Sequence, residues 1–367
     1  MDTLLDIVIR LVAVLLFITV TVLVLTYLER KVLARIQQRV GPMRTGPWGL
    51  LQPIADALKL LVKEDLLPGR VDRVMFWIAP LVVFVPAFVI WVTIPFTQEL
   101  VVRNMDLGIF FIVAVSALST TGIVLAGISS YNKYALLGAA RAAAQLITYE
   151  LPVVFAILAV VMIAESLDLR AVVQKQAALP YIVVQPVGFL LFLLAGLAEL
   201  GRTPFDIPSA ESELMGGSTV EYSGMHWAMF YLAEYANTFA LAALASLLYL
   251  GGWEGPVLPA LLGPVGNLLW FLIKCYVVVI LIFWVRSAFP RLRIDQLMGM
   301  GWKLLLSVSF ANMVLTAFYR FYRWPDGVML ALSLVMVAGA VYSLAQRRRA
   351  APIQSRIRLV PKEEFIQ

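Results

Sequence analysis

Long apolar runs separated by shorter polar stretches make up most of this chain. Each run is about 20 residues long, enough for a helix to cross a hydrocarbon layer about 30 Å thick. Because helices satisfy their own backbone polar groups in lipid, each run predicts a membrane-spanning helix. Nine spans are predicted, near residues 4–28, 74–97, 107–129, 142–164, 181–200, 226–250, 265–285, 303–319 and 327–346.

A different pattern occupies residues 50–63, between the first two predicted spans. Two opposite helical stripes are formed by the apolar residues Leu51, Ile54, Leu58 and Leu61 and by the polar residues Gln52, Asp56, Lys59 and Lys63. The pattern predicts an amphipathic helix at the membrane interface. Its narrow polar stripe suits either a water-exposed surface or the wall of a cavity that admits a long amphiphile, such as a quinone.

The composition supports a membrane protein. Of the 367 residues, 61% are hydrophobic and 14% are charged, whereas soluble domains carry about 25% charged residues. The predicted fold class is an all-α polytopic membrane protein with about nine transmembrane helices and amphipathic helices on the cytoplasmic side. Residues 1–346 are predicted to form a single integral membrane domain, and residues 347–367 a basic cytoplasmic tail.

The distribution of Lys and Arg predicts the orientation, because basic residues in short loops stay on the cytoplasmic side. The side that holds residues 29–73 also holds the other basic loops and the C-terminal tail. The exceptions are Arg10, Arg103, Arg170, Lys175, Lys274, Arg320 and Arg323. The N-terminus is therefore predicted to lie outside and the C-terminus in the cytoplasm, in a multi-pass protein.

An acidic segment between residues 199 and 234 interrupts this basic side. Its acids are Glu199, Asp206, Glu211, Glu213, Glu221 and Glu234, and apolar residues stand among them. The segment could be a solvated loop, but the apolar residues favour a short amphipathic helix that folds back into the membrane. Carboxylates held there in a partly dehydrated, water-containing cavity could hold and pass protons.

Glu150 extends this acidic group into the fourth predicted span. Neither Glu150 nor Glu234 can face lipid without a large cost in free energy. Pro152 removes a helix hydrogen bond beside Glu150 and predicts a kink there. In the structural alternative, Glu150 forms a buried ion pair with Arg141 or Lys274 and has only a packing role.

Cysteine and histidine are scarce, which limits the chemistry available to this chain alone. Cys275 is the only cysteine and His226 the only histidine, so the sequence supplies no set of ligands for an iron–sulfur cluster, a bis-His haem or a zinc site. Both residues are predicted to be structural. Any redox chemistry therefore requires a partner that carries the electrons.

Six ordered blocks between residues 20 and 310 resemble a known family. They are ERKVLARIQQRVGP, QPIADALKLLVKE, TYELP, AELGRTPFD with ESEL, EYSGM with AEY, and RSAFPRLRIDQLM. Together they are similar to the quinone-site membrane subunits of bacterial respiratory complex I, the proton-translocating NADH:quinone oxidoreductase.

The resemblance implies a protein that anchors the hydrophilic arm, forms the lower part of a quinone channel and couples quinone reduction to proton movement, without catalysing the redox step itself. Residues matching the quinone channel are Arg30, Arg39, Asp56, Lys59, Phe205, Arg286 and Arg291. Residues matching the proton passage are Glu150, Glu199, Asp206, Glu211, Glu213, Glu221, Glu234 and Tyr235.

The resemblance also implies cofactors and partners. Quinone is the substrate, this chain holds no cofactor or metal, and NAD, FMN and iron–sulfur clusters belong to partner subunits. The expected partners are soluble quinone-site and iron–sulfur subunits, small membrane subunits and membrane lipids, with no nucleic acid. The expected location is the bacterial plasma membrane.

Two features depart from the family pattern, and other functions remain open. Relatives often carry an acid where this chain has Ser209, and the ninth span with the basic tail Arg347–Arg349 exceeds the commoner eight spans. The alternatives are a membrane subunit of an energy-converting hydrogenase, a quinone oxidoreductase with a donor other than NADH, or an autonomous ion-coupled secondary transporter.

Overall fold

The computed structural model describes residues 2–177, 179–255 and 263–350. Every regular element in these ranges is helical, which confirms the all-α fold class. The α-helices are α1 (Asp2–Ile36), α2 (Gln52–Val62), α3 (Arg73–Val89), α4 (Gly108–Ser129), α5 (Lys133–Ala164), α6 (Leu169–Lys175), α7 (Tyr181–Val184), α8 (Pro186–Glu199), α9 (Glu211–Leu214), α10 (Gly224–Tyr249), α12 (Pro264–Ala288), α13 (Ile294–Met300), α14 (Leu306–Phe321) and α15 (Asp326–Ala350).

Within the described residues, six helical stretches are long and apolar enough to cross a membrane. They are Val8–Ile36, Arg73–Val92, Gly108–Ser129, Lys133–Ala164, Pro264–Ala288 and Ile294–Phe321. Pro186–Glu199 and Asp326–Gly339 are shorter apolar helices, and α10 carries Glu234 and Asn237 among its apolar residues. Each of the nine predicted spans thus overlaps a helix, and the number nine stays a prediction.

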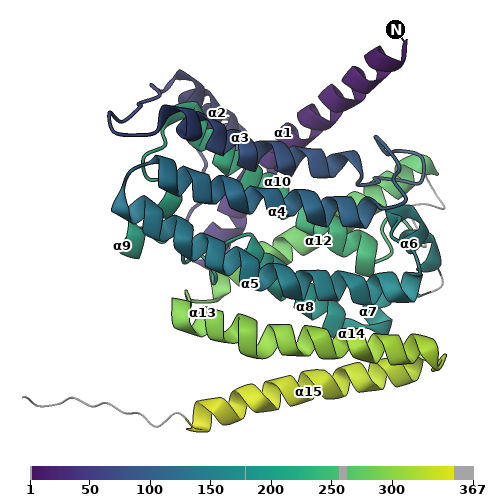
Figure 1. Cartoon of the computed structure of the whole chain (residues 1–367). Helices are drawn as coiled ribbons and strands as arrows, with labels where there is room; N and C mark the ends of the chain where they lie inside the picture. The colour runs from purple at the N-terminus through teal and green to yellow at the C-terminus, as the bar shows by residue number, and fades with distance from the viewer. Residues whose placement is uncertain (1, 178, 256–262, 351–367) are drawn as a thin grey trace, which may run out of the picture.

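The long helices run side by side in one bundle (Figure 1). α3 packs on α4, α4 on α5, and α5 on both α8 and α14, while α10 packs on α3 and α12. A cluster of aromatic rings fills the centre, where Trp91 stacks on Phe239 at 5.2 Å between ring centroids and Phe17 meets Phe96 edge to face at 5.0 Å. The N-terminal part of α1 projects away from the bundle, and its apolar side chains are exposed.

Two predicted loops are more helical than expected. α5 begins at Lys133, nine residues before the predicted span, because Asn132 caps its first turn by accepting a hydrogen bond from the backbone N–H of Tyr134. The eighth span is likewise preceded by α13, which starts at Ile294 and continues into a π-helical segment, Gly301–Leu305. The predicted loop at residues 286–303 is therefore only partly a loop.

The acidic segment is less helical than expected. Between α8 and α10 the only α-helix is α9 with four residues, so the predicted amphipathic helix is reduced to about one turn. Gly201, Gly216 and Gly217 adopt positive φ angles, and Pro204 follows a cis peptide bond. The three glycines supply turns on either side of α9, and these turns keep that helix short.

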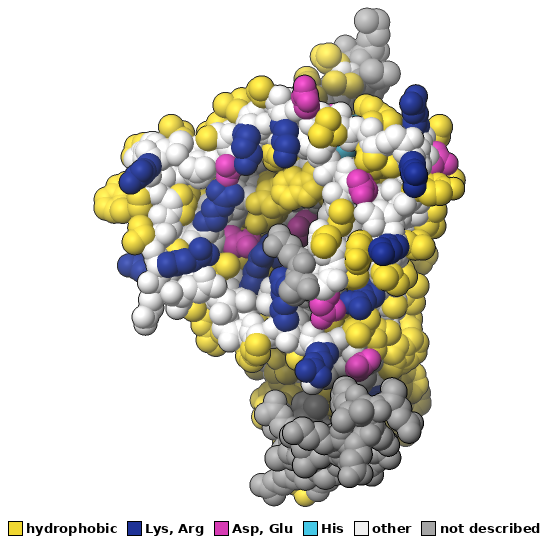
Figure 2. Space-filling view, turned by 90° about the vertical axis from the view of Figure 1, so that its left-hand side faces the viewer, with side chains coloured by type: hydrophobic (Ala, Val, Ile, Leu, Met, Phe, Trp, Pro, Cys, Tyr) yellow, Lys and Arg dark blue, Asp and Glu magenta, His cyan; other side chains and the backbone are white. Residues whose placement is uncertain are grey.

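One end of the bundle collects the polar segments. In Figure 1, α2, α9 and α13 all lie toward this end. Figure 2 looks straight at it and shows Lys and Arg side chains around a hollow, with apolar and acidic side chains visible inside. We call this end the basic face.

Candidate functional site

The first polar contact joins α1 to the amphipathic helix α2. The guanidinium of Arg30 lies 2.6 Å from the carboxylate of Asp56, and the ammonium of Lys59 lies 3.9 Å from it. Gln52, one turn earlier on α2, donates a hydrogen bond to Asp56 at 3.2 Å. Three of the predicted quinone-channel residues are thus brought together, and they fix the polar side of α2 against α1.

A buried ionic network lies next to this contact. Glu29 accepts hydrogen bonds from Arg286 and from Arg202, the latter at 3.3 Å, and Arg202 also lies 2.8 Å from the carboxylate of Glu234. The side chains of Arg202 and Glu29 are only 3% and 7% exposed. The Arg202 guanidinium stacks 4.3 Å above the ring of Tyr235. We call Glu29, Arg202, Glu234 and Arg286 the ionic network.

The carboxylate partners of Arg202 keep its guanidinium protonated. Burial alone lowers the pKa of the guanidinium, but Glu234 and Glu29 outweigh burial and hold this pKa above its ordinary value. Sequence reasoning did not select Glu29 or Arg202 as site residues. The signal was present in a single Arg among acids in AELGRTPFD and in a Glu at the end of a long apolar run.

The segment after α8 contributes a second contact at the basic face. Asp206 lies 2.9 Å from Arg291 and also accepts a hydrogen bond from Ser209. The ring of Phe205 is buried 6.0 Å from that of Tyr149. Arg39 is not brought to these groups, because it follows α1 on an exposed turn.

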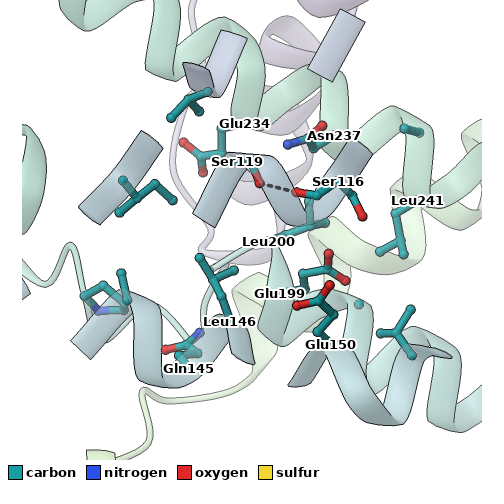
Figure 3. A pocket seen from close by; sticks show the side chains of 18 of the residues that line it. Ser116, Ser119, Gln145, Leu146, Glu150, Glu199, Leu200, Glu234, Asn237 and Leu241 are labelled. Atoms are coloured by element: carbon teal, nitrogen blue, oxygen red, sulfur yellow. Dashed lines mark hydrogen bonds between the residues drawn. The ribbon is translucent and has the colours of Figure 1, made fainter. Parts of the chain in front are cut away.

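A cavity of about 420 Å³ opens between α4, α5, α8 and α10. Its wall includes Glu150 from α5, Glu199 from α8 and Glu234 from α10, shown in Figure 3. The carboxyl groups of Glu150 and Glu199 lie next to each other in this view and interact electrostatically. Glu234 therefore belongs both to the cavity and to the ionic network, so the two are continuous.

Gln145 fixes the end of α8 that carries Glu199. Its side-chain amide is buried and donates hydrogen bonds to the carbonyl oxygens of Ala198 at 2.7 Å and Phe205 at 2.8 Å. These two bonds hold the last turn of α8 and the following segment against α5. The position of Glu199 thus depends on a glutamine that sequence reasoning did not identify.

The remaining predicted acids lie apart from the cavity. Glu213 pairs with Arg141 at 2.6 Å, and Glu221 accepts a hydrogen bond from Asn132 at 2.7 Å. The side chain of Glu211 lies outside the described ones. The structure therefore joins Glu150, Glu199 and Glu234 and places Glu213 and Glu221 in separate contacts.

The proposed structural partners of Glu150 have other partners. Arg141 binds Glu213, and the ammonium of Lys274 donates hydrogen bonds to the carbonyl oxygens of Leu250, Gly252 and Glu254 at 2.7, 2.9 and 2.7 Å. The alternative of a buried Glu150–Arg141 or Glu150–Lys274 pair is therefore wrong. Glu150 instead faces the cavity.

Known proteins resemble this chain over most of its length. The profile of the NADH dehydrogenase family matches residues 9–317, a stretch that contains the cavity and the ionic network. The H subunit of the NADH-quinone oxidoreductase of a Dehalococcoides mccartyi strain is 48% identical over 328 residues, covering 89% of this chain and 90% of the relative. That of Anoxybacillus flavithermus is 50% identical over 293 residues, covering 80% and 87%.

Proposed function

Because the chain belongs to the NADH dehydrogenase family, as an H subunit of NADH-quinone oxidoreductase (complex I), we propose that it forms the membrane entrance of a quinone channel and couples quinone reduction to proton movement. The observation that carries the proposal is the continuity of the ionic network with the cavity through Glu234. A charge change near the basic face can reach acids inside the bundle through this one side chain.

The quinone is proposed to enter beside α1 and α2. The Arg30–Asp56–Lys59 contact supports this, because it gathers charged groups on α2, and α2 lies toward the end of the bundle where Figure 2 shows the hollow. Apolar side chains of α2, such as Leu58 and Leu61, are exposed and suit contact with lipid or with an isoprenoid chain. Arg286 and Arg291 would complete the polar rim, each already bound to a carboxylate.

The coupling step is proposed to be electrostatic. Reduction of a quinone to a quinol takes up two electrons and two protons, and the electrons come from iron–sulfur clusters in partner subunits that also hold FMN and bind NAD. The protons leave a charge change near the channel, and the ionic network would transmit it to Glu234. Interacting acids titrate as a group, so Glu199 and Glu150 would respond together.

The orientation proposed from the sequence completes this arrangement. The basic face would lie on the cytoplasmic side of the plasma membrane, where the soluble subunits of the complex bind. Its Lys and Arg side chains, prominent in Figure 2, suit both an acidic partner surface and anionic lipid headgroups.

The test replaces each cavity acid in the assembled complex. We expect Glu150→Gln, Glu199→Gln and Glu234→Gln to remove most proton translocation in proteoliposomes, measured as protons moved per quinol formed. Glu64→Gln, at an exposed acid away from the cavity, is the matched control. Wild-type translocation in all three cavity variants would reject the proposed coupling role.

A further inference from the structure

The acids of the cavity are in two groups. Glu150 and Glu199 lie next to each other, whereas Glu234 lies apart from them in Figure 3, on the wall formed by α10. Much of the cavity wall is apolar and includes Ile112, Ile157 and Leu241. A proton cannot cross apolar surface, so a passage between the two groups needs additional hydrogen-bonding groups.

Three neutral polar side chains also line the cavity. Ser116 and Ser119 come from α4 and stand three residues apart, so they share one side of that helix. Asn237 comes from α10, three residues after Glu234. In Figure 3 Ser119 lies between Glu234 and the Glu150–Glu199 pair, with Ser116 beside it, and Asn237 lies next to Glu234.

The hydroxyl groups of the two serines still have acceptor capacity. Ser116 donates its hydroxyl proton to the carbonyl of Val113 at 2.9 Å, and Ser119 donates to the carbonyl of Ser116 at 2.7 Å. A hydroxyl oxygen has two lone pairs, so each serine can also accept a hydrogen bond from the cavity. Both side chains are partly exposed, and the space they face is the cavity.

Asn237 points independently to a bound molecule. Its Oδ1 atom is buried and has no hydrogen-bond partner among the described residues. A buried polar atom left unsatisfied costs about 1–3 kcal/mol, so such atoms in folded proteins are normally bonded to protein or to water. Because Asn237 lines the cavity, rotation of its amide group would bring Oδ1 to a donor there.

We infer that Ser116, Ser119 and Asn237 form a water-binding bridge that carries protons between the Glu150–Glu199 pair and Glu234. The inference rests on the proposed coupling function and adds α4 to the proton passage. The ligand is a short chain of water molecules, each of which needs about three hydrogen bonds and about 30 Å³. The cavity volume of about 420 Å³ leaves room for such a chain.

If the two serines had a purely structural role, removal of their hydroxyl groups would not affect proton translocation specifically. Serine hydroxyls inside membrane helices often bond to a carbonyl of their own helix without further function. Ser309 on α14 is such a case, since it is fully buried, donates to the carbonyl of Leu306 at 3.0 Å and is not on the cavity wall. It is the matched control for the removal of a serine hydroxyl.

The test uses the whole complex in proteoliposomes and measures protons moved per quinol formed. Ser116→Ala with Ser119→Ala, and separately Asn237→Leu, are expected to lose most of this translocation. Ser309→Ala should keep it. Ser116→Thr with Ser119→Thr retains both hydroxyls and should restore translocation, which a general packing defect would not do.

The outcomes separate this inference from the proposed function. Wild-type translocation in the Ser116/Ser119 alanine variant and in Asn237→Leu, with loss in Glu150→Gln and Glu234→Gln, would overturn the bridge and leave the coupling role standing. Normal translocation in the glutamine variants as well would overturn both. If the double alanine variant fails to assemble, protons moved per quinol formed are measured in the single variants Ser119→Ala and Asn237→Leu instead. Wild-type translocation in both would overturn the bridge.

Discussion

The Nε atom of Arg202 lies 2.8 Å from the carboxylate of Glu234, and this contact ties the turn after α8 to the middle of α10. The guanidinium is almost fully buried and also binds Glu29 on α1. One side chain thus joins three segments that are distant in the sequence. Replacement of Arg202 leaves Glu234 without its cation and Glu29 with Arg286 alone.

Arg202→Met should therefore destabilise the protein strongly. Removal of one partner of a buried ion pair costs up to about 3–5 kcal/mol, and here the cost is reduced because Glu29 keeps Arg286 and the Glu234 side chain is partly exposed. Arg202→Lys keeps the charge but cannot bind both carboxylates with one planar fork, so we expect an intermediate loss. Thermal unfolding of the purified complex measures both, and a wild-type midpoint for Arg202→Met would contradict the importance of the network.

Gly301 should not tolerate even alanine. A Cβ at this position would lie 2.5 Å from Cγ2 of Thr148, too close for van der Waals contact. Overpacking of this kind costs about 1–3 kcal/mol. The partner substitution Thr148→Ser removes the clashing methyl group and keeps the hydroxyl that donates to the carbonyl of Ala144.

The thermal stability of the double variant tests whether the clash with Thr148 causes the loss of stability. Gly301→Ala with Thr148→Ser should recover most of the stability lost in Gly301→Ala alone, because the methyl group that clashes with the new Cβ is then absent. An equally unstable double variant would show that the π-helical segment itself requires glycine. Thr148→Ser alone is the control.

The single histidine fastens the segment between α2 and α3 to α10. His226 is buried, contacts the carboxylate of Asp65 through Nδ1 and meets Trp77 edge to face at 4.2 Å between ring centroids. The neighbouring Ser223 accepts a hydrogen bond from the backbone N–H of Leu66 at 2.9 Å. α2 is thus held at its C-terminal end as well as by Arg30.

His226→Leu and Asp65→Asn should each lower stability. A polar contact with a charged carboxylate contributes about 1.5–3 kcal/mol, and the double variant should cost less than the sum of the single ones. A double-mutant cycle on thermal unfolding of the complex measures this coupling. Additive effects would show that Asp65 and His226 act separately.

The Glu165–Arg320 contact should depend on pH. Nε of Arg320 donates to Glu165 at 2.7 Å, and this hydrogen bond, together with the charge of Arg320, lowers the pKa of Glu165. A carboxyl with a lowered folded-state pKa stabilises the protein above its usual pKa of about 4.3 and loses this contribution as the pH falls through the folded-state value.

Glu165→Gln should consequently lower the unfolding temperature slightly at pH 7, and the difference from the wild type should shrink at acidic pH. The effect is small because the contact is exposed to solvent. Unfolding curves of both proteins at several pH values measure it. A difference that stays constant from pH 7 to well below pH 4 would contradict the assignment to Glu165.

The sequence predicted the positions of the helices better than the contacts between them. The stripes on residues 50–63 predicted α2, which spans Gln52–Val62, because periodicity is a local property of the chain. The boundary of α5 was missed because its first nine residues, KYALLGAAR, include Lys133 and Arg141 and were read as part of a basic loop. Hydropathy locates the apolar part of such a helix and not its capped end.

The candidate site was only partly predictable for a related reason. Acids in apolar surroundings identified Glu150, Glu199 and Glu234, but the cavity that joins them depends on how α5, α8 and α10 pack, which no local pattern encodes. The network was harder still, since Glu29 and Arg202 are 173 residues apart. Ser116 and Ser119 carried no signal at all, as neutral hydroxyls are ordinary in membrane helices.

The separation between Glu29 and Arg286 also has a consequence in time. Glu29 is translated 257 residues before Arg286. At about 5–20 residues per second, the ribosome takes roughly 13–50 seconds to supply that second cation. Arg202, which follows Glu29 by 173 residues, is made earlier, so for the last part of this interval the carboxylate has only one of its two native cations. The ion pairs of α1 are therefore complete only after α12 has been made.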